Sequence, residues 1–226
     1  MDDKRPLFIL AGNGPYTNRG CEAIVRGTVK ILRASFKDSR FICLSHFQSD
    51  EQYQQQCLQE TDRAITHLYS YRLSKGDVAR KFWKPFHLGY AYDHFFRPDA
   101  LKYRIYKQML PYLDGAAAVL SVGGDNYSLD YGGSKLFTDL DDIAIQKGKV
   151  IIIWGASVGP FSAIPKYERY MCRHLQEVTG IFARESSTID YLKNIGVTEN
   201  VYPVADPAFL MDPIKPEGIE NVLPLD

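Results

Sequence analysis

The stretch AAAVLSVGGDNYSLDYGG, residues 116–133, decides the predicted fold. Its first part, residues 116–122, is a continuous run of small and β-branched apolar residues, typical of a strand buried on both faces of a parallel sheet. The run leads directly into two glycines, a carboxylate and an amide. Ligands of open α/β sheets bind beyond the carboxyl ends of the strands, so this junction is a candidate ligand site. In the alternative interpretation the glycines only turn the chain, and Asp125 or Asn126 caps the next helix.

Apolar runs of the same kind recur along the chain and alternate with helical patterns. Strands are expected at residues 7–11, 41–47, 63–69, 116–122, 150–154, 180–183 and 201–204. Helices are expected at residues 21–36, 50–60, 98–113, 134–147 and 165–178, and Ser186 or Ser187 is expected to cap a further helix. Such alternation implies right-handed parallel crossovers. The sequence therefore predicts one doubly wound α/β domain, residues 1–211, of about seven mostly parallel strands, followed by a linker at residues 212–226.

The composition narrows the class of protein. Lys plus Arg and Asp plus Glu both number 27, and this balance argues against a dedicated nucleic-acid binder. No stretch approaches the ~20 apolar residues that span a bilayer, and the early aspartates do not fit a secretory signal. The cysteines have no CxxC spacing, so we expect reduced thiols in a cytoplasmic protein, without a zinc site. They are Cys21, Cys43, Cys57 and Cys172.

A glycine-rich loop, residues 12–20, joins the first predicted strand to the first predicted helix. Helix N-termini attract phosphate or carboxylate groups through unpaired N–H groups and partial positive charge. Asn18 and Arg19 stand at this position, and Arg19 adds a full positive charge. The spacing is neither GxGxxG nor a P-loop, so neither dinucleotide nor ATP binding is supported. An ordinary turn is the alternative for the glycines.

Residues 71–113 differ from the rest because aromatic and basic residues are interleaved there. After Pro98, the residues Leu101, Ile105, Met109 and Leu113 form one apolar stripe of a predicted helix, which is most simply part of the core. The aromatic and basic section before Pro98 suits a membrane surface or a sugar face. The alternative, which we favour at this point, is an insertion that packs on its own small cluster.

Polar groups follow several of the predicted strands. Because strand ends of one parallel sheet meet at one edge, we expect these groups to converge there, together with the glycines beside them. His174, on the apolar stripe of its helix, is interpreted as a core histidine and not as a catalyst. The candidate substrate-binding residues are Asn18, Arg19, Gly123, Gly124, Asp125, Asn126, Ser157, Arg184, Glu185 and Asp206.

Five motifs at these junctions resemble the polysaccharide pyruvyl transferase family. They are NRGCEAI (18–24), SVGGDN (121–126), WGASVGPF (154–161), FARESSTIDYL (182–192) and VADPAF (204–209). The resemblance implies one half of a two-domain architecture like that of GT-B glycosyltransferases. It further implies transfer of the pyruvyl group of phosphoenolpyruvate onto two sugar hydroxyls as a ketal, during polysaccharide biosynthesis. Family members are cytosolic or membrane-peripheral.

The resemblance also assigns roles to residues of this chain. Arg184 matches an arginine expected to hold the phosphate or carboxylate of the donor, both of which are anions that arginine can grip bidentately. Asn18, Arg19, Gly123 and Asp125 match loop positions of the family. No cofactor is implied besides the donor substrate. The acceptor is expected to be a glycan or a lipid-linked saccharide, with peripheral membrane contact as an option.

The sequence leaves the catalytic group open. The family's general acid or base is expected to be a histidine of a second domain, and this chain looks like the N-terminal half. We expect Asp125 and Asn126 to position acceptor hydroxyls and not to bind a metal, since one carboxylate and one amide are too few ligands. Two other functions stay open at this point: a non-catalytic glycan- or nucleotide-binding module, and half of a GT-B glycosyltransferase.

Overall fold

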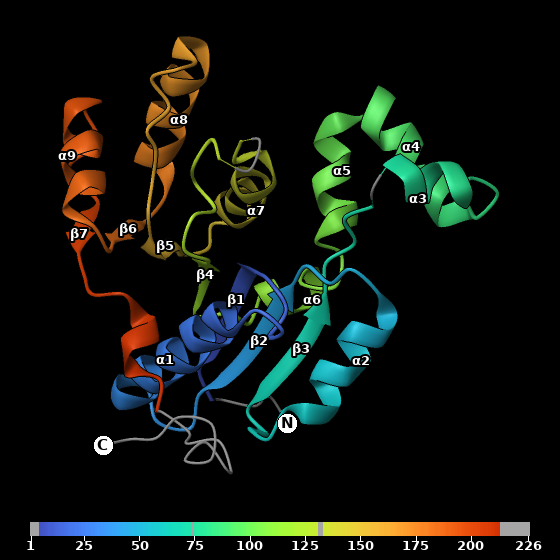
Figure 1. Ribbon diagram of the computed structural model, residues 1–226, viewed down its shortest axis with the longest axis horizontal. Helices are drawn as coiled ribbons and strands as arrows, with labels where there is room; N and C mark the ends of the chain where they lie inside the picture. Colours follow the sequence, from blue (N-terminus) through green and yellow to red (C-terminus); the bar gives the residue numbers. More distant parts are fainter. Residues whose placement is uncertain (1–4, 74, 131–132, 213–226) are drawn as a thin grey trace, which may run out of the picture.

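A computed structural model describes residues 5–73, 75–130 and 133–212, and shows a single sheet of seven parallel strands (Figure 1). The strand order is β3-β2-β1-β4-β5-β6-β7, so the winding direction reverses between β1 and β4. This arrangement confirms the predicted doubly wound α/β fold. The strands are β1 (Leu7–Asn13), β2 (Arg40–Ser45), β3 (Ile65–Tyr69), β4 (Ala118–Val122), β5 (Ile151–Ala156), β6 (Gly180–Ala183) and β7 (Val201–Pro203).

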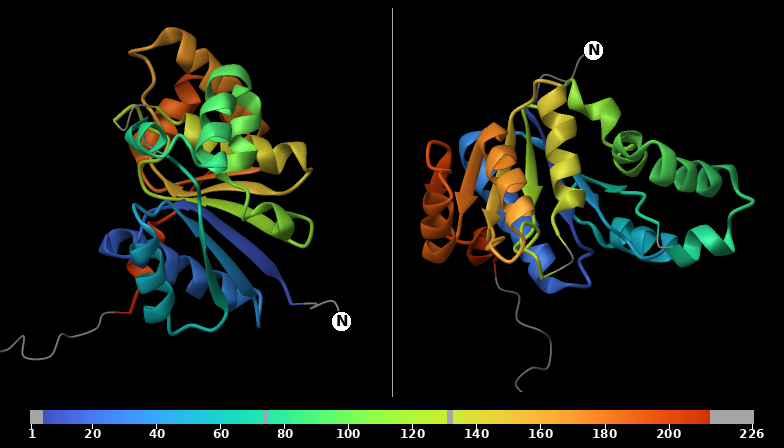
Figure 2. Two further views of the ribbon diagram at one scale, coloured as in Figure 1. Left: turned by 90° about the vertical axis from the view of Figure 1, so that its right-hand side faces the viewer. Right: turned by 90° about the horizontal axis from the view of Figure 1, so that it is seen from above.

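Two layers of helices enclose the sheet (Figure 2). One layer holds α1 (Arg19–Ser35) and α2 (Asp50–Gln59), together with a 3-10 turn, η1 (Pro207–Leu210), that packs on α1. The other layer holds α7 (Lys135–Gln146), α8 (Pro165–Glu177) and α9 (Ser186–Asn194). The segment between β3 and β4 forms α3 (Lys75–Arg80), α4 (Pro85–Phe96), α5 (Pro98–Ile105) and α6 (Leu110–Leu113).

The central strands are apolar on both faces because each face packs against one helix layer. Phe8 and Leu10 of β1 belong to a core cluster with the buried face of α1. Ile9 and Ala11, which alternate with them, belong to a second cluster with α7, α8 and α9. The period of two along a strand therefore divides one continuous apolar run between two separate cores.

Helix α1 is placed against the sheet by its cap and by close contacts with η1. The Asn18 side chain caps the helix by accepting a hydrogen bond from the Gly20 amide at 3.0 Å. The indole of Trp154, on β5, donates to the Thr28 hydroxyl at 3.0 Å. A Cβ on Gly27 would overlap the backbone carbonyl of Pro207, so this glycine lets η1 lie directly on the helix.

Two predictions about residues 71–113 need correction. The expected helix over residues 98–113 is two helices, α5 and α6, although Ile105, Met109 and Leu113 all lie in the core as expected. Pro111 sits in the first turn of α6, and a proline disfavours continuation of a helix through that position. The inward residues of the segment join the main core cluster and do not form a cluster of their own.

The predicted caps also differ from the structure. Glu185 is the N-cap residue of α9, without a side-chain cap bond, so neither Ser186 nor Ser187 has that role. The N-cap of α7 is Ser134, so neither Asp125 nor Asn126 caps that helix. Of the predicted linker, only Asp212 is described, in an ion pair with Lys30 at 2.6 Å, and residues 213–226 lie outside the described residues.

Candidate functional site

Five of the predicted site residues meet at the carboxyl ends of β4 to β7. Arg184 directly follows β6 and contacts the other four. Its Nη1 lies 2.7 Å from Oδ2 of Asp206, and its Nη2 lies 2.9 Å from Oδ1 of Asp125. Its Nε donates to the Ser157 hydroxyl at 3.2 Å and lies 3.6 Å from Oε1 of Glu185. Ser157 in turn donates to Glu185 at 2.9 Å, which closes the cluster.

The cluster is acidic overall, with three carboxylates around one guanidinium. Arg184 and Asp206 are the more enclosed members, with side chains 18% and 23% exposed. Asp125 and Glu185 are about half exposed, at 49% and 47%. Exposed ion pairs are individually worth only about 0–1 kcal/mol, so Asp206 is the anchor of Arg184 and the other two acids are easily displaced.

Two glycines after β4 make room for this cluster. A Cβ on Gly124 would lie 2.8 Å from both terminal nitrogens of Arg184, so a larger residue would push the guanidinium away. Gly123 has a φ of 141° and its missing Cβ leaves space for the amide of Asn126. The loop requires glycine at both positions because a side chain from elsewhere occupies the space.

The other three predicted residues lie outside this cluster and make local contacts. The Asn126 amide nitrogen donates to the carbonyls of Gly12 and Val122, each at 3.1 Å, and thus ties the loop after β4 to the end of β1 where the sheet order reverses. Asn18 caps α1. Arg19 pairs with Glu22 at 2.7 Å, and its side chain is 85% exposed.

A buried polar network anchors the loop after β4, which carries Asp125, to the core. The Tyr127 hydroxyl donates to the carboxylate of Asp141 on α7, at 2.8 Å, and lies 2.8 Å from the Ser121 hydroxyl on β4. Nε2 of His174, on α8, lies 2.9 Å from the same carboxylate. The backbone of Tyr127 also accepts a hydrogen bond from Gly159 at 2.8 Å, which ties the loops after β4 and β5 together.

His174 is a core histidine, as the sequence predicted, and it faces a buried carboxylate. Its side chain is 3% exposed and Asp141 is fully buried. Burial alone would lower the pKa of His174, but the hydrogen bond and charge of Asp141 outweigh burial, so the pKa is raised. Burial also raises the pKa of the Asp141 carboxyl, against the opposing effect of His174. Tyr127, Asp141 and His174 thus form one hydrogen-bonded network inside the core.

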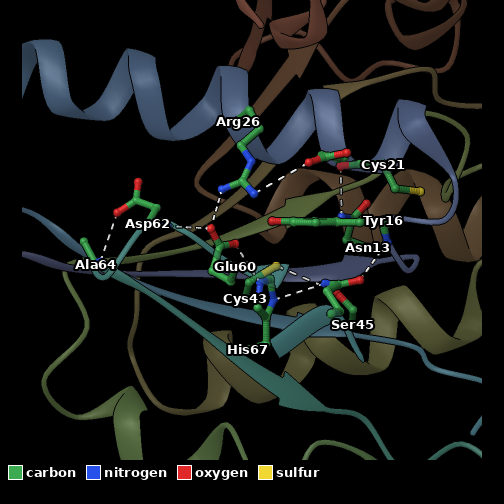
Figure 3. A network of polar contacts seen from close by, with 12 residues as sticks. Asn13, Tyr16, Cys21, Arg26, Cys43, Ser45, Glu60, Asp62, Ala64 and His67 are labelled. Atoms are coloured by element: carbon green, nitrogen blue, oxygen red, sulfur yellow. Dashed lines mark hydrogen bonds and ion pairs between the residues drawn. The ribbon is translucent and has the colours of Figure 1, made fainter. Parts of the chain in front are cut away.

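A second polar network lies between α1, α2, strand β2 and the edge strand β3 (Figure 3). Glu60 accepts from Arg26 at 2.7 Å and lies 2.9 Å from Nε2 of His67. The Arg26 guanidinium lies 5.2 Å from the centre of the Tyr16 ring. The pKa of His67 is raised to about 9, because hydrogen bonds with Cys43 and Glu60 outweigh the lowering effect of burial.

Sequence reasoning missed this second network because its members come from four separate elements. It borders a pocket of about 290 Å³ beside the start of α1, and the Tyr16 hydroxyl is buried without a hydrogen-bond partner among the described residues. The pocket carries both signs of charge. Its lining is Tyr16, Thr17, Arg19, Glu22, Arg26, Gln55 and Gln59.

The described residues contain neither a metal-binding cluster, nor a membrane-spanning helix, nor a disulfide. Within residues 5–73, 75–130 and 133–212, no group of three or more His, Cys, Asp or Glu side chains has the geometry of a metal site. In the same part of the chain, no helix is long and apolar enough to cross a bilayer. The four cysteines are free thiols.

The chain folds as a doubly wound α/β domain, the class in which ligands bind beyond the carboxyl ends of the strands. Residues 18–225 match the family described as polysaccharide pyruvyl transferase, and the chain belongs to this family. The chain is 26% identical over 207 residues to the amylovoran biosynthesis protein AmsJ of Erwinia amylovora. The match covers 90% of this chain and 49% of AmsJ, so the chain spans about half the length of that curated relative.

Proposed function

We propose that the chain is the donor-binding half of an enzyme that transfers the pyruvyl group of phosphoenolpyruvate to a polysaccharide precursor as a ketal. The second half would be a similar α/β domain, as in GT-B enzymes, and would supply the histidine acid or base. The observation that carries the proposal is the Arg184 cluster, assembled from four strand ends in a chain of this family. The name of AmsJ, which refers to polysaccharide biosynthesis, supports the same substrate class.

The proposed reaction needs a cation for the donor and acceptors for the sugar hydroxyls. Two C–O bonds form at the central carbon of phosphoenolpyruvate, and its bond to the phosphate oxygen breaks. One hydroxyl proton ends on the methylene carbon, which becomes a methyl group, and the other leaves with inorganic phosphate. No oxidant or reductant is required. The electrostatic task is to hold an anion beside carboxylates that receive protons.

The geometry of Arg184 allows both tasks in one place. Asp206 fixes one terminal nitrogen from a partly enclosed position, while Asp125 and Glu185 occupy the other edge of the guanidinium as exposed partners. A phosphate or carboxylate of the donor would replace these weak partners and take the free edge bidentately. Asp125, once released, would accept a hydrogen bond from a hydroxyl of the acceptor.

Substitution of Arg184 tests the proposal in the whole enzyme that contains this chain. Arg184→Ala is expected to lower kcat/KM for phosphoenolpyruvate by about 2–4 kcal/mol of transition-state stabilisation. Arg184→Lys should restore little, because lysine keeps the charge but lacks the planar fork. The assay follows phosphate release and, by mass spectrometry, the pyruvylated saccharide. Arg173→Lys, at an exposed position on α8, is the matched control and should be silent.

Two results would contradict the proposal. A lowered melting temperature with unchanged kcat/KM would show that Arg184 only holds its four neighbours in place. A reaction that requires a nucleotide sugar and releases no phosphate from phosphoenolpyruvate would indicate a glycosyltransferase.

A further inference from the structure

Helix α4 carries large apolar side chains that the fold leaves uncovered. Leu88, Tyr92, Phe95 and Phe96 are 60%, 54%, 75% and 73% exposed. Their spacing of four, three and one residues places them on one face of the helix. Phe82 and Trp83, at the corner before α4, are 62% and 67% exposed, and their rings lie 5.6 Å apart. We call these six side chains the α4 aromatic face.

The opposite face of α4 packs against α5 and the core. Packing of the domain therefore does not account for the exposed α4 aromatic face. Asp93 is buried and pairs with Arg104 of α5 at 2.6 Å. The Phe86 ring lies 5.7 Å from the Arg104 guanidinium, and a Cβ on Gly89 would lie 3.0 Å from it. Tyr90, on the same side, belongs to the main core. The helix is therefore fixed with the α4 aromatic face outward.

Basic residues outnumber acids along the segment that carries this face. The acids beside it are the exposed Asp99 of α5 and Glu51 of α2, which interacts electrostatically with Lys81. Between residues 78 and 98 the basic residues are Arg80, Lys81, Lys84 and Arg97, and the only acid is the buried Asp93. Lys81, Lys84 and Arg97 are exposed at the two ends of α4. Figures 1 and 2 show α3 and α4 at the end of the molecule opposite α9, where they project beyond the sheet.

We propose that the α4 aromatic face binds the surface of an anionic lipid bilayer. Phe, Trp and Leu side chains at an interface bury their apolar parts among the acyl chains, while Tyr and Trp keep polar atoms at the headgroups. Lys and Arg beside them extend toward anionic headgroups. A mainly cationic rim disfavours a basic partner surface, and an apolar patch of this kind marks an interaction site. The inference does not depend on the proposed reaction, because lipid binding is measured without substrate.

Tryptophan fluorescence gives a direct test. The chain has two tryptophans, and Trp154 is half-buried on β5 with its indole hydrogen-bonded to Thr28. Emission of Trp83 should shift to the blue when phosphatidylglycerol–phosphatidylcholine vesicles are added to the 226-residue chain, and the shift should vanish in Trp83→Phe. Sedimentation with the same vesicles should fall as salt rises, because salt screens the charge component. Vesicles of phosphatidylcholine alone should bind much less.

Variants separate the charged and apolar contributions. Removing the charges of Lys81 and Lys84 together, as Lys→Gln, should weaken vesicle binding roughly thirtyfold, since each basic residue near an anionic surface is worth about a factor of five. Phe95→Ser should weaken it at every salt concentration. Matched controls are Lys166→Gln on α8 and Phe209→Ser, whose side chain is 84% exposed on η1. Both controls should leave vesicle binding unchanged.

The same experiments give different results if the α4 aromatic face binds something other than a lipid surface. If vesicles do not sediment the chain even at low salt, the proposal is wrong. If the chain instead sediments as a dimer that Phe95→Ser dissociates, with no blue shift on vesicle addition, the face is an interface between copies. Equal losses in the control variants would mean that lipid binding is a general property of the surface, which also overturns the proposal.

Discussion

Replacement of Asp141 by asparagine tests whether the buried network supports the site. Asp141 is fully buried, and it accepts from Tyr127 and pairs with His174. Removing one partner of a buried ion pair costs about 3–5 kcal/mol, so we expect Asp141→Asn to lose that much stability at about pH 6. The adjacent Asp142 is the matched control. Its side chain is 32% exposed and lies 3.5 Å from Nδ1 of His174 and 3.3 Å from Lys102. Asp142→Asn should cost less than Asp141→Asn because the Asp142 carboxylate is partly exposed, although the buried Lys102 loses this partner.

The effect of Asp141→Asn should depend on pH, with a sign set by the histidine. The pKa of His174 is raised in the folded protein, so the stability it contributes is present below its unfolded value of about 6.5. That stability is lost as the pH rises through the folded pKa. The difference between the native protein and Asp141→Asn should therefore shrink as the pH increases.

Urea denaturation, followed by circular dichroism at several pH values, measures both expectations. The m-value reports whether the variant still unfolds as the same compact domain. Equal losses for Asp141→Asn and Asp142→Asn, or a loss that does not shrink at higher pH, would refute the idea that a buried charged pair holds this region. A confirmed loss would explain how the loop that bears Asp125 stays in place, because Tyr127 lies in that loop.

Two further predictions concern stability away from the Arg184 cluster. Gly27→Ala should lower the thermal midpoint of unfolding, because overlap with the Pro207 carbonyl costs about 1–3 kcal/mol and exceeds the gain of about 1 kcal/mol in helix propensity. The control Gly115→Ala should leave the midpoint unchanged, because a Cβ there meets nothing closer than 4.0 Å. The pKa of His67 is raised to about 9, so its pair with Glu60 should stabilise the fold fully below about pH 6.5 and stop doing so as the pH rises through about 9. Urea midpoints of Glu60→Gln should show a smaller decline, since Cys43 also raises the pKa of His67, and an identical decline would count against the pair as a source.

Local patterns were sufficient to predict the strands and the edge at which polar groups gather. The apolar run at residues 116–122 indicated a central strand, and β4 lies between β1 and β5. Arg184, Asp125 and Asp206 come from separate strand ends, yet the rule that parallel strands end at one edge was enough to expect them together. The apolar periodicity did not predict the break between α5 and α6, because Ile105, Met109 and Leu113 all face the core on both sides of it. Pro111 was the residue in the sequence that indicated a break.

The orientation of side chains was decided by tertiary packing. Nothing local distinguishes Asp125, whose carboxylate faces Arg184, from Asn126, whose amide turns back to Gly12, a residue 114 positions earlier in the chain. In the same way, Arg26, Glu60 and His67 form one network only because α1, α2 and β3 pack around it. Periodicity determines which face of an element is buried, since it depends on neighbours in sequence. Which charge meets which depends on contacts between distant segments, and only the assembled sheet and its two helix layers fix those contacts.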